Sequence, residues 1–327
     1  MRRMAWWFSL LLLAGAIFPA AAQGLPPLYH EVAGGELKYE VTRKVTLPRV
    51  ALEHGVQWRV LARENEIDKP YRLAPGMAIE INNTHIVPTE LANGFVINLP
   101  ELLLYHFKDG KYLRRYALVV GKRSWPTPTG NYHIRNKTKN PTWTVPASIQ
   151  AEMEAMGQTV LEKVPPGPKN PLGDYWMGTS AAGVGIHATN RPWSVGHSVS
   201  HGCIRMLPDE IETLFPQVEV GLPVKIIYRP VKLAVVQEGR IFLEAHPNIY
   251  LKEMNYLEMV KAAAKVYGLT ERMDWDKVKE VVKDREGIAE DVTKGPPVTA
   301  DGAAAPENAA AGEARLTPVR EPETRQD

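Results

Sequence analysis

The spacing of apolar residues predicts short β-strands through the middle of the chain. From Gly94 onward, apolar runs of strand length alternate with turns rich in Gly and Pro, and a Lys-Asp-Gly turn at 108–110 joins two runs as in an antiparallel hairpin. The stretch "VPPGPKNPLG" at 164–173 holds too many Pro and Gly for regular structure and predicts a loop. The strands that we expect cover residues 95–99, 102–107, 112–120, 175–179, 183–189, 203–206, 223–228 and 240–246, with one more after "SWPTPTG". The pattern predicts a mainly β domain at 94–229, which is an ordinary domain size.

Residues 39–82, ahead of this domain, show a strand, helix, helix, strand pattern. In "LPRVALEHG" the apolar residues lie on one helical face and the helix ends at Gly55; "WRVLARENEI" repeats the pattern, and "RLAPGMAIEI" is a Pro-Gly turn followed by an alternating strand. The face of the first helix consists of Leu47, Val50, Ala51 and Leu52.

Helical periodicity also appears late in the chain. A short helix at 207–218 is predicted with Asp209 as its N-terminal cap, and residues 251–267 and 275–283 have the spacing of longer helices. We expect a hairpin and helices at 230–285. From 286 to 327 large apolar side chains are nearly absent, which predicts a disordered tail.

The first 22 residues have the layout of a secretory signal peptide. Arg2 and Arg3 precede an apolar run at 6–17, and Ala20 to Ala22 supply a small-residue cleavage signal. The run is shorter than the roughly 20 residues of a membrane-spanning helix, and no later segment is apolar enough to span. We therefore expect export, and no integral membrane span after signal removal.

Net charge and cysteine content limit the partners and the thiol chemistry that the sequence supports. The formal net charge of +2 argues neither for nor against an anionic partner, and we expect no nucleic-acid partner. The chain has 1 Cys, so no disulfide can form within it. An odd thiol in an exported protein indicates pairing between chains or a reactive group.

That thiol, Cys203 in "SHGCIRM", has the surroundings of a nucleophile. A nucleophilic thiol needs a base, donors for an oxyanion and access. His187, His197 and His201 are possible bases, Gly202 permits close backbone approach, and the Cys203 amide is a natural oxyanion donor. The neighbours are polar rather than aliphatic, which disfavours the alternative of a buried inert thiol.

Zinc is the rival interpretation of the same histidines. With Cys203 they would supply four ligands, and His/Cys sites are usual for zinc. The spacing H-x3-H-x-C matches none of the common structural zinc motifs, however, and a second Cys is absent. We therefore expect no metal and no cofactor.

At this point a family resemblance becomes specific. The segment "IHATN…SVSHGCIRM" resembles the signature of the L,D-transpeptidase catalytic domain (YkuD type): a His, a spacer, Ser/Thr-His-Gly-Cys, an apolar residue and Asn or Arg. The stretches "INLPELLLY", "SWPTPTGNYHI", "NPTWTVPASIQAE" and "VPPGPKNPLG" resemble the ErfK/YbiS/YcfS/YnhG branch. The resemblance covers roughly residues 39–247 and implies a mainly β, β-sandwich-like catalytic domain with short helices after it.

The resemblance implies a role for each site residue. Cys203 is the nucleophile, and His187 is the general acid and base, oriented by the backbone carbonyl of Ala188. His201 and Gly202 line the oxyanion site together with the Cys203 amide. His197 is interpreted as a solvated loop residue.

Four further residues are expected to bind substrate or support the loop. Ser200 supports the cysteine loop by hydrogen bonding, and Arg205 holds that loop or a substrate carboxylate. Tyr175 and Trp176 either form the wall of the donor groove or are core aromatics of a strand.

Residues 38–84 resemble a LysM module, the small βααβ fold that binds N-acetylglucosamine-containing glycans. The usual Gly-Asp-Thr-Leu after the first strand is replaced here by Arg43 to Leu47. The segment is therefore either a peptidoglycan-binding module or a spacer that packs on the next domain.

The implied function is L,D-transpeptidation on peptidoglycan in the periplasm. Cys203 attacks the third stem residue, D-Ala leaves, and an amine receives the acyl group. The partners are stem peptides and glycan, with an outer-membrane lipoprotein as a second acceptor. An L,D-carboxypeptidase or amidase of the same fold and a non-catalytic wall-binding protein are the alternatives. A papain-like protease is disfavoured because its Cys-to-His order is reversed here.

Overall fold

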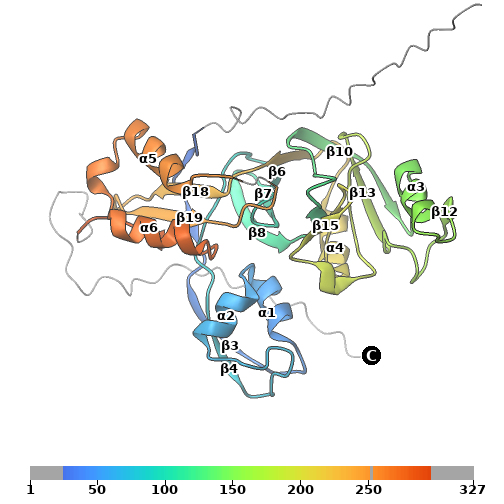
Figure 1. The fold of residues 1–327 in the computed structure, drawn as a ribbon, viewed down its shortest axis with the longest axis horizontal. Helices are drawn as coiled ribbons and strands as arrows, with labels where there is room; N and C mark the ends of the chain where they lie inside the picture. Colours follow the sequence, from blue (N-terminus) through green and yellow to red (C-terminus); the bar gives the residue numbers. More distant parts are fainter. Residues whose placement is uncertain (1–24, 251–252, 296–327) are drawn as a thin grey trace, which may run out of the picture.

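The structure is a computed structural model that describes residues 25–250 and 253–295. The predicted signal peptide at 1–22 lies outside these residues. Figure 1 shows a central β-rich part, a small N-terminal module below it and a C-terminal unit at one end.

The central part is one eight-stranded sheet. Its strands are β6 (Gly94–Asn98), β7 (Leu103–Lys108), β8 (Lys111–Ala117), β10 (Gly130–Lys139), β13 (Tyr175–Thr179), β14 (Gly185–His187), β16 (Ile204–Arg205) and β17 (Pro223–Ile227). Their order is β16-β14-β13-β10-β17-β6-β7-β8. The predicted antiparallel pairing of β6 with β7 and of β7 with β8 is confirmed, as is the mainly β class. A smaller pair, β9 (Val120–Gly121) and β15 (Ser198–Ser200), lies beside the sheet.

Helix α4 (Pro208–Leu214) covers the core of this sheet, and its start differs from the prediction. Ile211 and Leu214 are fully buried in the core. The N-cap is Leu207, which makes no side-chain cap bond, and Pro208 opens the first turn. Asp209 lies inside that turn, and its carboxylate pairs with Arg49. The prediction of Asp209 as the cap is wrong because proline is preorganised for the first helical position.

The N-terminal module has the predicted strand, helix, helix, strand order. Its elements are β3 (Glu36–Glu40), α1 (Leu47–His54), α2 (Trp58–Glu64) and β4 (Ala78–Asn82), with β3 and β4 antiparallel. Thr46 caps α1 by accepting the Arg49 amide, and Gly55 ends it at φ 66°. Leu47, Val50 and Ala51 are buried against the strands, as the periodicity predicts.

The module is docked on both of its neighbours. Arg49 of α1 pairs with Asp209 of α4, and Arg115 of β8 donates to the His54 carbonyl at the end of α1. On the other side, Arg63 of α2 pairs with Glu286. These contacts hold the module between the central sheet and the C-terminal unit.

The C-terminal unit is a four-stranded sheet with two helices. The sheet contains β1 (Leu28–Tyr29), β18 (Val231–Val235), β19 (Ile241–Ala245) and β20 (Glu290–Asp291), and α5 (Tyr256–Val266) and α6 (Trp275–Asp284) pack on it. The prediction that the disordered tail starts at 286 is wrong for its first ten residues. Strand β20 pairs with β19, and Ile288, Ala289 and Val292 are buried, because these few apolar residues find an open strand edge. Residues 296–327 lie outside the described part.

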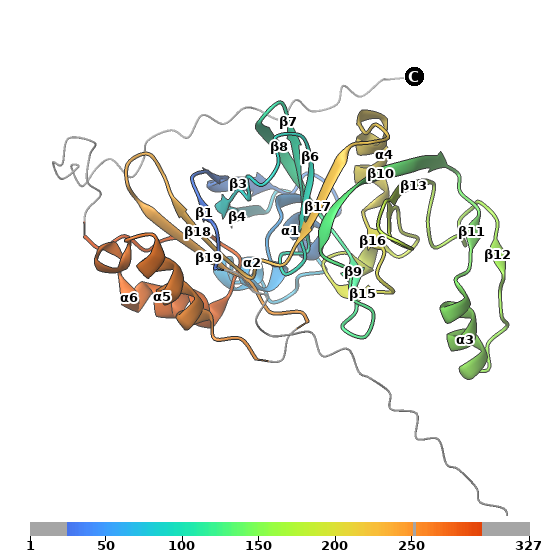
Figure 2. The same cartoon turned by 90° about the horizontal axis from the view of Figure 1, so that it is seen from above.

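An arm extends from the far ends of β10 and β13 (Figure 2). It consists of β11 (Trp143–Thr144), α3 (Ala147–Ala155) and β12 (Lys163–Val164), and α3 has no buried residue. Most of the loop predicted at 164–173 follows this arm, although Val164 belongs to β12. Two further short strands, β2 (Val32–Ala33) and β5 (His85–Ile86), pair antiparallel, and β5 contacts β18 and β19 of the C-terminal unit.

Candidate active site

Strand pairing brings His187 and Cys203 to one face of the sheet. Strand β14 is parallel to β16, with His187 opposite Arg205 and Ile186 opposite Ile204. Cys203 directly precedes β16, and side chains alternate along a strand. His187, Cys203 and Arg205 therefore share one face, while Ile186 and Ile204 point into the core, where both are fully buried.

The imidazole of His187 is held in one tautomer. Its Nδ1 lies 2.6 Å from the Ala188 carbonyl oxygen, which can only accept, so Nδ1 has the proton and Nε2 keeps its lone pair. The ring is 3% exposed and stacks on Trp176 at 5.8 Å between centroids. Burial, and then the positive charge of Arg205, lower the pKa of His187 to about 3. The ring is therefore neutral at physiological pH.

The thiol of Cys203 is half-buried and protonated in this state. Its S–H donates to the Gly183 carbonyl oxygen at 3.4 Å. Burial raises the pKa of the thiol, and the Gly185 backbone and the Arg205 charge only partly offset that rise. The site therefore holds a neutral thiol and a neutral imidazole rather than a thiolate–imidazolium pair, which makes proton transfer part of any attack by sulfur.

Hydrogen bonds fix the turn that presents Cys203. Ser200 is fully buried; its hydroxyl donates to the Cys203 carbonyl and accepts the Gly202 amide at 3.2 Å. Thr127 donates to the Gly202 carbonyl at 2.9 Å. Gly202 has φ 101°, a conformation that favours glycine. The Gly202 amide is already bonded to Ser200, so it is not free to donate to an oxyanion. Gly202 instead sets the backbone conformation that leads to the Cys203 amide.

The ring of His201 points to the arm rather than to the thiol. Its Nε2 lies 2.6 Å from a carboxylate oxygen of Glu152 on α3 and 3.2 Å from the Lys122 ammonium. Trp125 packs edge-on against the same ring at 4.7 Å between centroids. His201 therefore connects the nucleophile turn to α3. The exposed His197 faces the Val195 carbonyl instead.

The three remaining predicted residues differ in position. Arg205 lies opposite His187, and its Nε is buried without a hydrogen-bond partner, which leaves a donor at the site. Trp176 shares the His187 face. Tyr175, one residue earlier on β13, points to the core side, where it packs on Phe215 at 5.0 Å. Of the two alternatives given for this pair, the core position therefore applies to Tyr175, and the two residues do not form one wall because side chains alternate along the strand.

Comparison with known proteins identifies the family of this chain. The profile of the YkuD family, described as the L,D-transpeptidase catalytic domain, matches residues 92–226. The protein named "Probable L,D-transpeptidase YcfS" of Escherichia coli K12 is 33% identical over 256 residues, which are 75% of this chain and 80% of that protein. The chain belongs to the L,D-transpeptidase family.

Two further similarities extend this comparison. The protein named "Probable L,D-transpeptidase ErfK/SrfK" of Salmonella typhimurium is 28% identical over 310 residues, which are 91% of this chain and 99% of that protein. The solved catalytic domain of the E. faecium L,D-transpeptidase is 28% identical, with a TM-score of 0.32 over 42% of this chain and 99% of that one. The predicted family and enzyme class are thus confirmed. None of the helices in the described residues is long and apolar enough to cross a membrane.

Several site residues of this L,D-transpeptidase were not found from the sequence. Tyr250 donates to the Gly121 carbonyl at 2.8 Å and accepts the Thr127 amide, so it supports the turn from the C-terminal side. Glu152 and Lys122 hold His201. The stretch that contains Thr127, "SWPTPTG", stood out by its Pro and Gly content, but nothing local marks Tyr250 or Glu152 as neighbours of Cys203.

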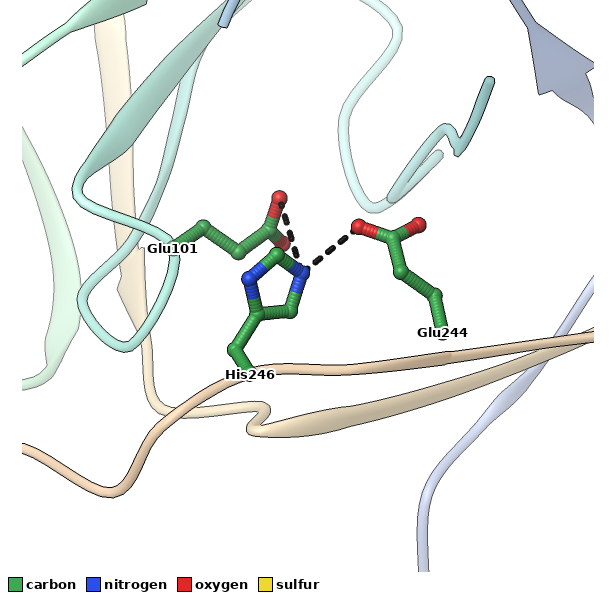
Figure 3. A group of neighbouring side chains, drawn as sticks. All are labelled: Glu101, Glu244 and His246. Carbon is green, nitrogen blue, oxygen red and sulfur yellow. Dashed lines mark hydrogen bonds and ion pairs between the residues drawn. The ribbon is translucent and has the colours of Figure 1, made fainter. Parts of the chain in front are cut away.

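A second polar cluster lies between the central sheet and the C-terminal unit. Among the described residues, the group Glu101, Glu244 and His246 has ligand atoms within 4.8 Å of one another and is fully buried (Figure 3). The ammonium of Lys232 lies 3.0 Å from a carboxylate oxygen of each Glu. It also donates to the Ile86 carbonyl at 2.6 Å. An ammonium already compensates these carboxylates, so the cluster is a structural ion network rather than a metal centre.

Proposed function

We propose that this L,D-transpeptidase acts on peptidoglycan with Cys203 as nucleophile and His187 as general acid and base. One observation supports this assignment most directly. The Ala188 carbonyl fixes the proton on Nδ1 of His187, which leaves Nε2 unprotonated, and His187 shares one face of the sheet with Cys203. The imidazole is neutral at physiological pH, so its Nε2 lone pair can accept the thiol proton during attack.

The first half-reaction forms a thioester. The hydrogen bond from the Cys203 thiol to the Gly183 carbonyl breaks, and the thiol proton moves to His187 Nε2. The sulfur then attacks the carbonyl carbon of the third stem residue. The Cys203 amide stabilises the oxyanion. The C–N bond to the terminal D-Ala then breaks, and the imidazolium returns its proton to the departing amine.

The second half-reaction transfers the acyl group to an amine. An amine of another stem, from the side chain of a diamino acid, attacks the thioester while His187 accepts its proton. The C–S bond breaks and the thiol of Cys203 is restored by that proton. The energy of the old amide is thus kept in the thioester, so no nucleotide is needed. The product is a 3→3 cross-link.

Other acceptors use the same acyl-enzyme. A lysine of an outer-membrane lipoprotein would attach that protein to the wall, and water would give carboxypeptidase or amidase activity. We assign transfer to a peptidoglycan amine as the main reaction. The predicted N-terminal export signal and this substrate support a location in the periplasm, associated with the cell wall.

Two side chains near the thiol are assigned to binding of the acyl-donor stem peptide. The guanidinium of Arg205, a partly exposed residue opposite His187, is a donor for a substrate carboxylate. Trp176, stacked on His187, forms the wall of the donor groove on that side. Ser200 supports the turn from the interior and does not reach substrate, because it is fully buried.

Intact mass after incubation with a carbapenem tests the nucleophile. We expect one covalent adduct on the wild type, none on Cys203→Ala, and a strongly slowed adduct on His187→Ala. His197→Ala is the matched control, since it removes an imidazole from the same segment and should react like the wild type. Release of D-Ala from a stem tetrapeptide should follow the same order. A folded wild type without an adduct, or a full adduct on Cys203→Ala, would overturn the assignment.

A further inference from the structure

The turn that presents Cys203 lies between two neighbouring strands. On one side, β14 pairs with β16 and places His187 opposite Arg205. On the other side, Val119 forms an antiparallel bridge with the same Arg205. Strand β9 follows Val119 directly, and Lys122 is the first residue after β9. Lys122 therefore reaches the turn from the side opposite to His187.

A carboxylate on this second side holds an ammonium. One oxygen of Glu152 lies 3.2 Å from Lys122 Nζ, and the other lies 2.6 Å from Nε2 of His201, two residues before Cys203. An ionised carboxylate only accepts hydrogen bonds, so both partners donate to it. These bonds, first from His201 and then from Lys122, lower the pKa of Glu152 and keep it charged. The Trp125 ring lies 5.9 Å from the same ammonium and completes a site for one cation.

The ammonium in this site is open to exchange. The side chains of Lys122 and Glu152 are 33% and 32% exposed. An exposed ion pair contributes little to stability, because water and dissolved ions compete for both partners. An ammonium that arrives from solution can therefore take the place of Lys122 at the carboxylate, and the Lys122 side chain can turn into solvent.

The charges around the turn match the two substrates of the proposed reaction. Arg205 lies next to His187, and the positive charge of Arg191 also acts on it. Glu152 places a negative charge on the arm side. The donor stem ends in a carboxylate, and an alkyl amine acceptor is protonated in neutral water, since its pKa is about 10. Complementary charges of this kind select a partner and set its orientation.

From this arrangement we propose that Glu152 binds the ammonium of the acceptor, which replaces Lys122 beside His201, and so selects alkyl amines over neutral nucleophiles. The inference rests on the proposed function and adds an acceptor side to the donor side at His187 and Arg205. The bound nitrogen gives one proton to water before it attacks. Its C–N bond then forms, the C–S bond breaks, and a second proton passes to His187. Holding the acceptor beside the turn raises its effective concentration at the thioester.

A competition between two acceptors for one thioester tests this assignment. The full chain is incubated with a stem tetrapeptide and with two acceptors together. Nα-acetyl-lysine amide has one ammonium group, whereas hydroxylamine is uncharged in neutral water. Mass spectrometry measures the ratio of the lysine adduct to the hydroxamate. Both products come from the same thioester, so this ratio does not depend on how fast the thioester forms.

The variants should change this ratio in opposite directions. Glu152→Gln should lower it about tenfold, because glutamine can still accept the His201 N–H but has no charge for the ammonium. Lys122→Met removes the resident ammonium and should raise the ratio about threefold. Glu154→Gln, at an exposed position of the same helix α3, is the matched control and should give the wild-type ratio. Melting curves identify any variant that fails to fold.

The outcomes separate this proposal from the chemistry at Cys203. A looser arm alone would slow both transfers alike, so an unchanged ratio in Glu152→Gln would overturn the acceptor site. A lower ratio in Lys122→Met would overturn it too. Release of D-Ala by the wild type without a lysine adduct would also overturn it, while the thioester chemistry would stand. A wild type without a carbapenem adduct would instead contradict the proposed function.

Discussion

Replacing Lys232 by Met should destabilise the protein through unpaired buried carboxylates. The Lys232 side chain is 0% exposed, and its ammonium lies 3.0 Å from oxygens of Glu101 and Glu244, both also at 0% side-chain exposure. Removing one partner of a buried ion pair costs about 3–5 kcal/mol. His246, 2.6 Å from Glu244, remains as a hydrogen-bond partner of that carboxylate, so we expect the lower part of that range. At roughly 2–4 °C per kcal/mol for a protein of this size, Tm falls by about 6–12 °C.

Thermal unfolding followed by circular dichroism measures this change, with Lys279→Met as the matched control. Lys279 pairs with Asp276 on the surface of α6, where both side chains are at least 60% exposed, so its loss should cost less than about 0.5 kcal/mol. Adding Glu101→Gln to Lys232→Met should recover part of the loss. A Tm at pH 8 within about 2 °C of the wild type would refute the role of the ammonium.

The stability of Lys232→Met should also depend on pH, which gives a second test of the role of the ammonium. In the wild type, burial acts to raise the pKa of Glu244. The charge of Lys232 and the hydrogen bonds from His246 and the Ile86 amide outweigh burial and hold this pKa below its usual range. Without the ammonium, burial dominates and raises the folded-state pKa of Glu244 above the unfolded value. The folded variant then binds more protons than the unfolded chain at intermediate pH, so its stability falls as pH rises. The deficit should be larger at pH 8 than at pH 5.

Three further predictions concern the active site. Because burial lowers the pKa of His187 to about 3 and raises that of Cys203, carbapenem acylation should change less than about twofold between about pH 5.5 and 7.5; a sigmoidal dependence centred near the ordinary histidine pKa of about 6.5 would contradict the neutral pair. Glu152→Ala removes the bond between α3 and His201, so limited proteolysis of the arm at 143–164 should accelerate; cleavage at the wild-type rate would show that the contact does not hold the arm. Ser200→Ala removes two hydrogen bonds in a buried turn and should cost about 1–3 kcal/mol and slow acylation more than about tenfold, whereas Ser194→Ala, which loses a surface bond to the Arg191 carbonyl, should react normally.

Most strands and helices of this enzyme were predictable because apolar spacing determines them locally. The hairpins of β6 to β8 and the helices α1 and α2 follow their patterns within a few residues. Helix α3 was missed because none of its residues is buried, so it lacks the apolar stripe that marks a helix. The ordered residues after 286 were missed because their burial depends on the edge of β19, which is far away in sequence.

The candidate site was predictable to the level of the two residues that we propose as catalytic. The His and the SHGC segment were singled out from the sequence, and the pairing of β14 with β16 places both on one face. The partners of His201 were not predictable, since Glu152 belongs to a helix without an apolar stripe and the family resemblance of its stretch assigns it no role. The sequence left Tyr175 and Trp176 with the same two alternatives because adjacent aromatics look alike in sequence, while the register of β13 gives them opposite faces.

The N-terminal module is held in a fixed position by contacts on two of its sides. Arg115 of the central sheet is buried and donates to the carbonyl oxygens of His54 and Asn83, on both flanks of the module. Arg63 fixes the opposite side through Glu286. A module on a flexible tether would move independently of the catalytic domain, whereas these contacts hold the module against both of its neighbours. Removing Arg115 should therefore lower the Tm more than breaking the Arg63–Glu286 pair, because the Arg63 side chain is 60% exposed and surface ion pairs contribute little to stability.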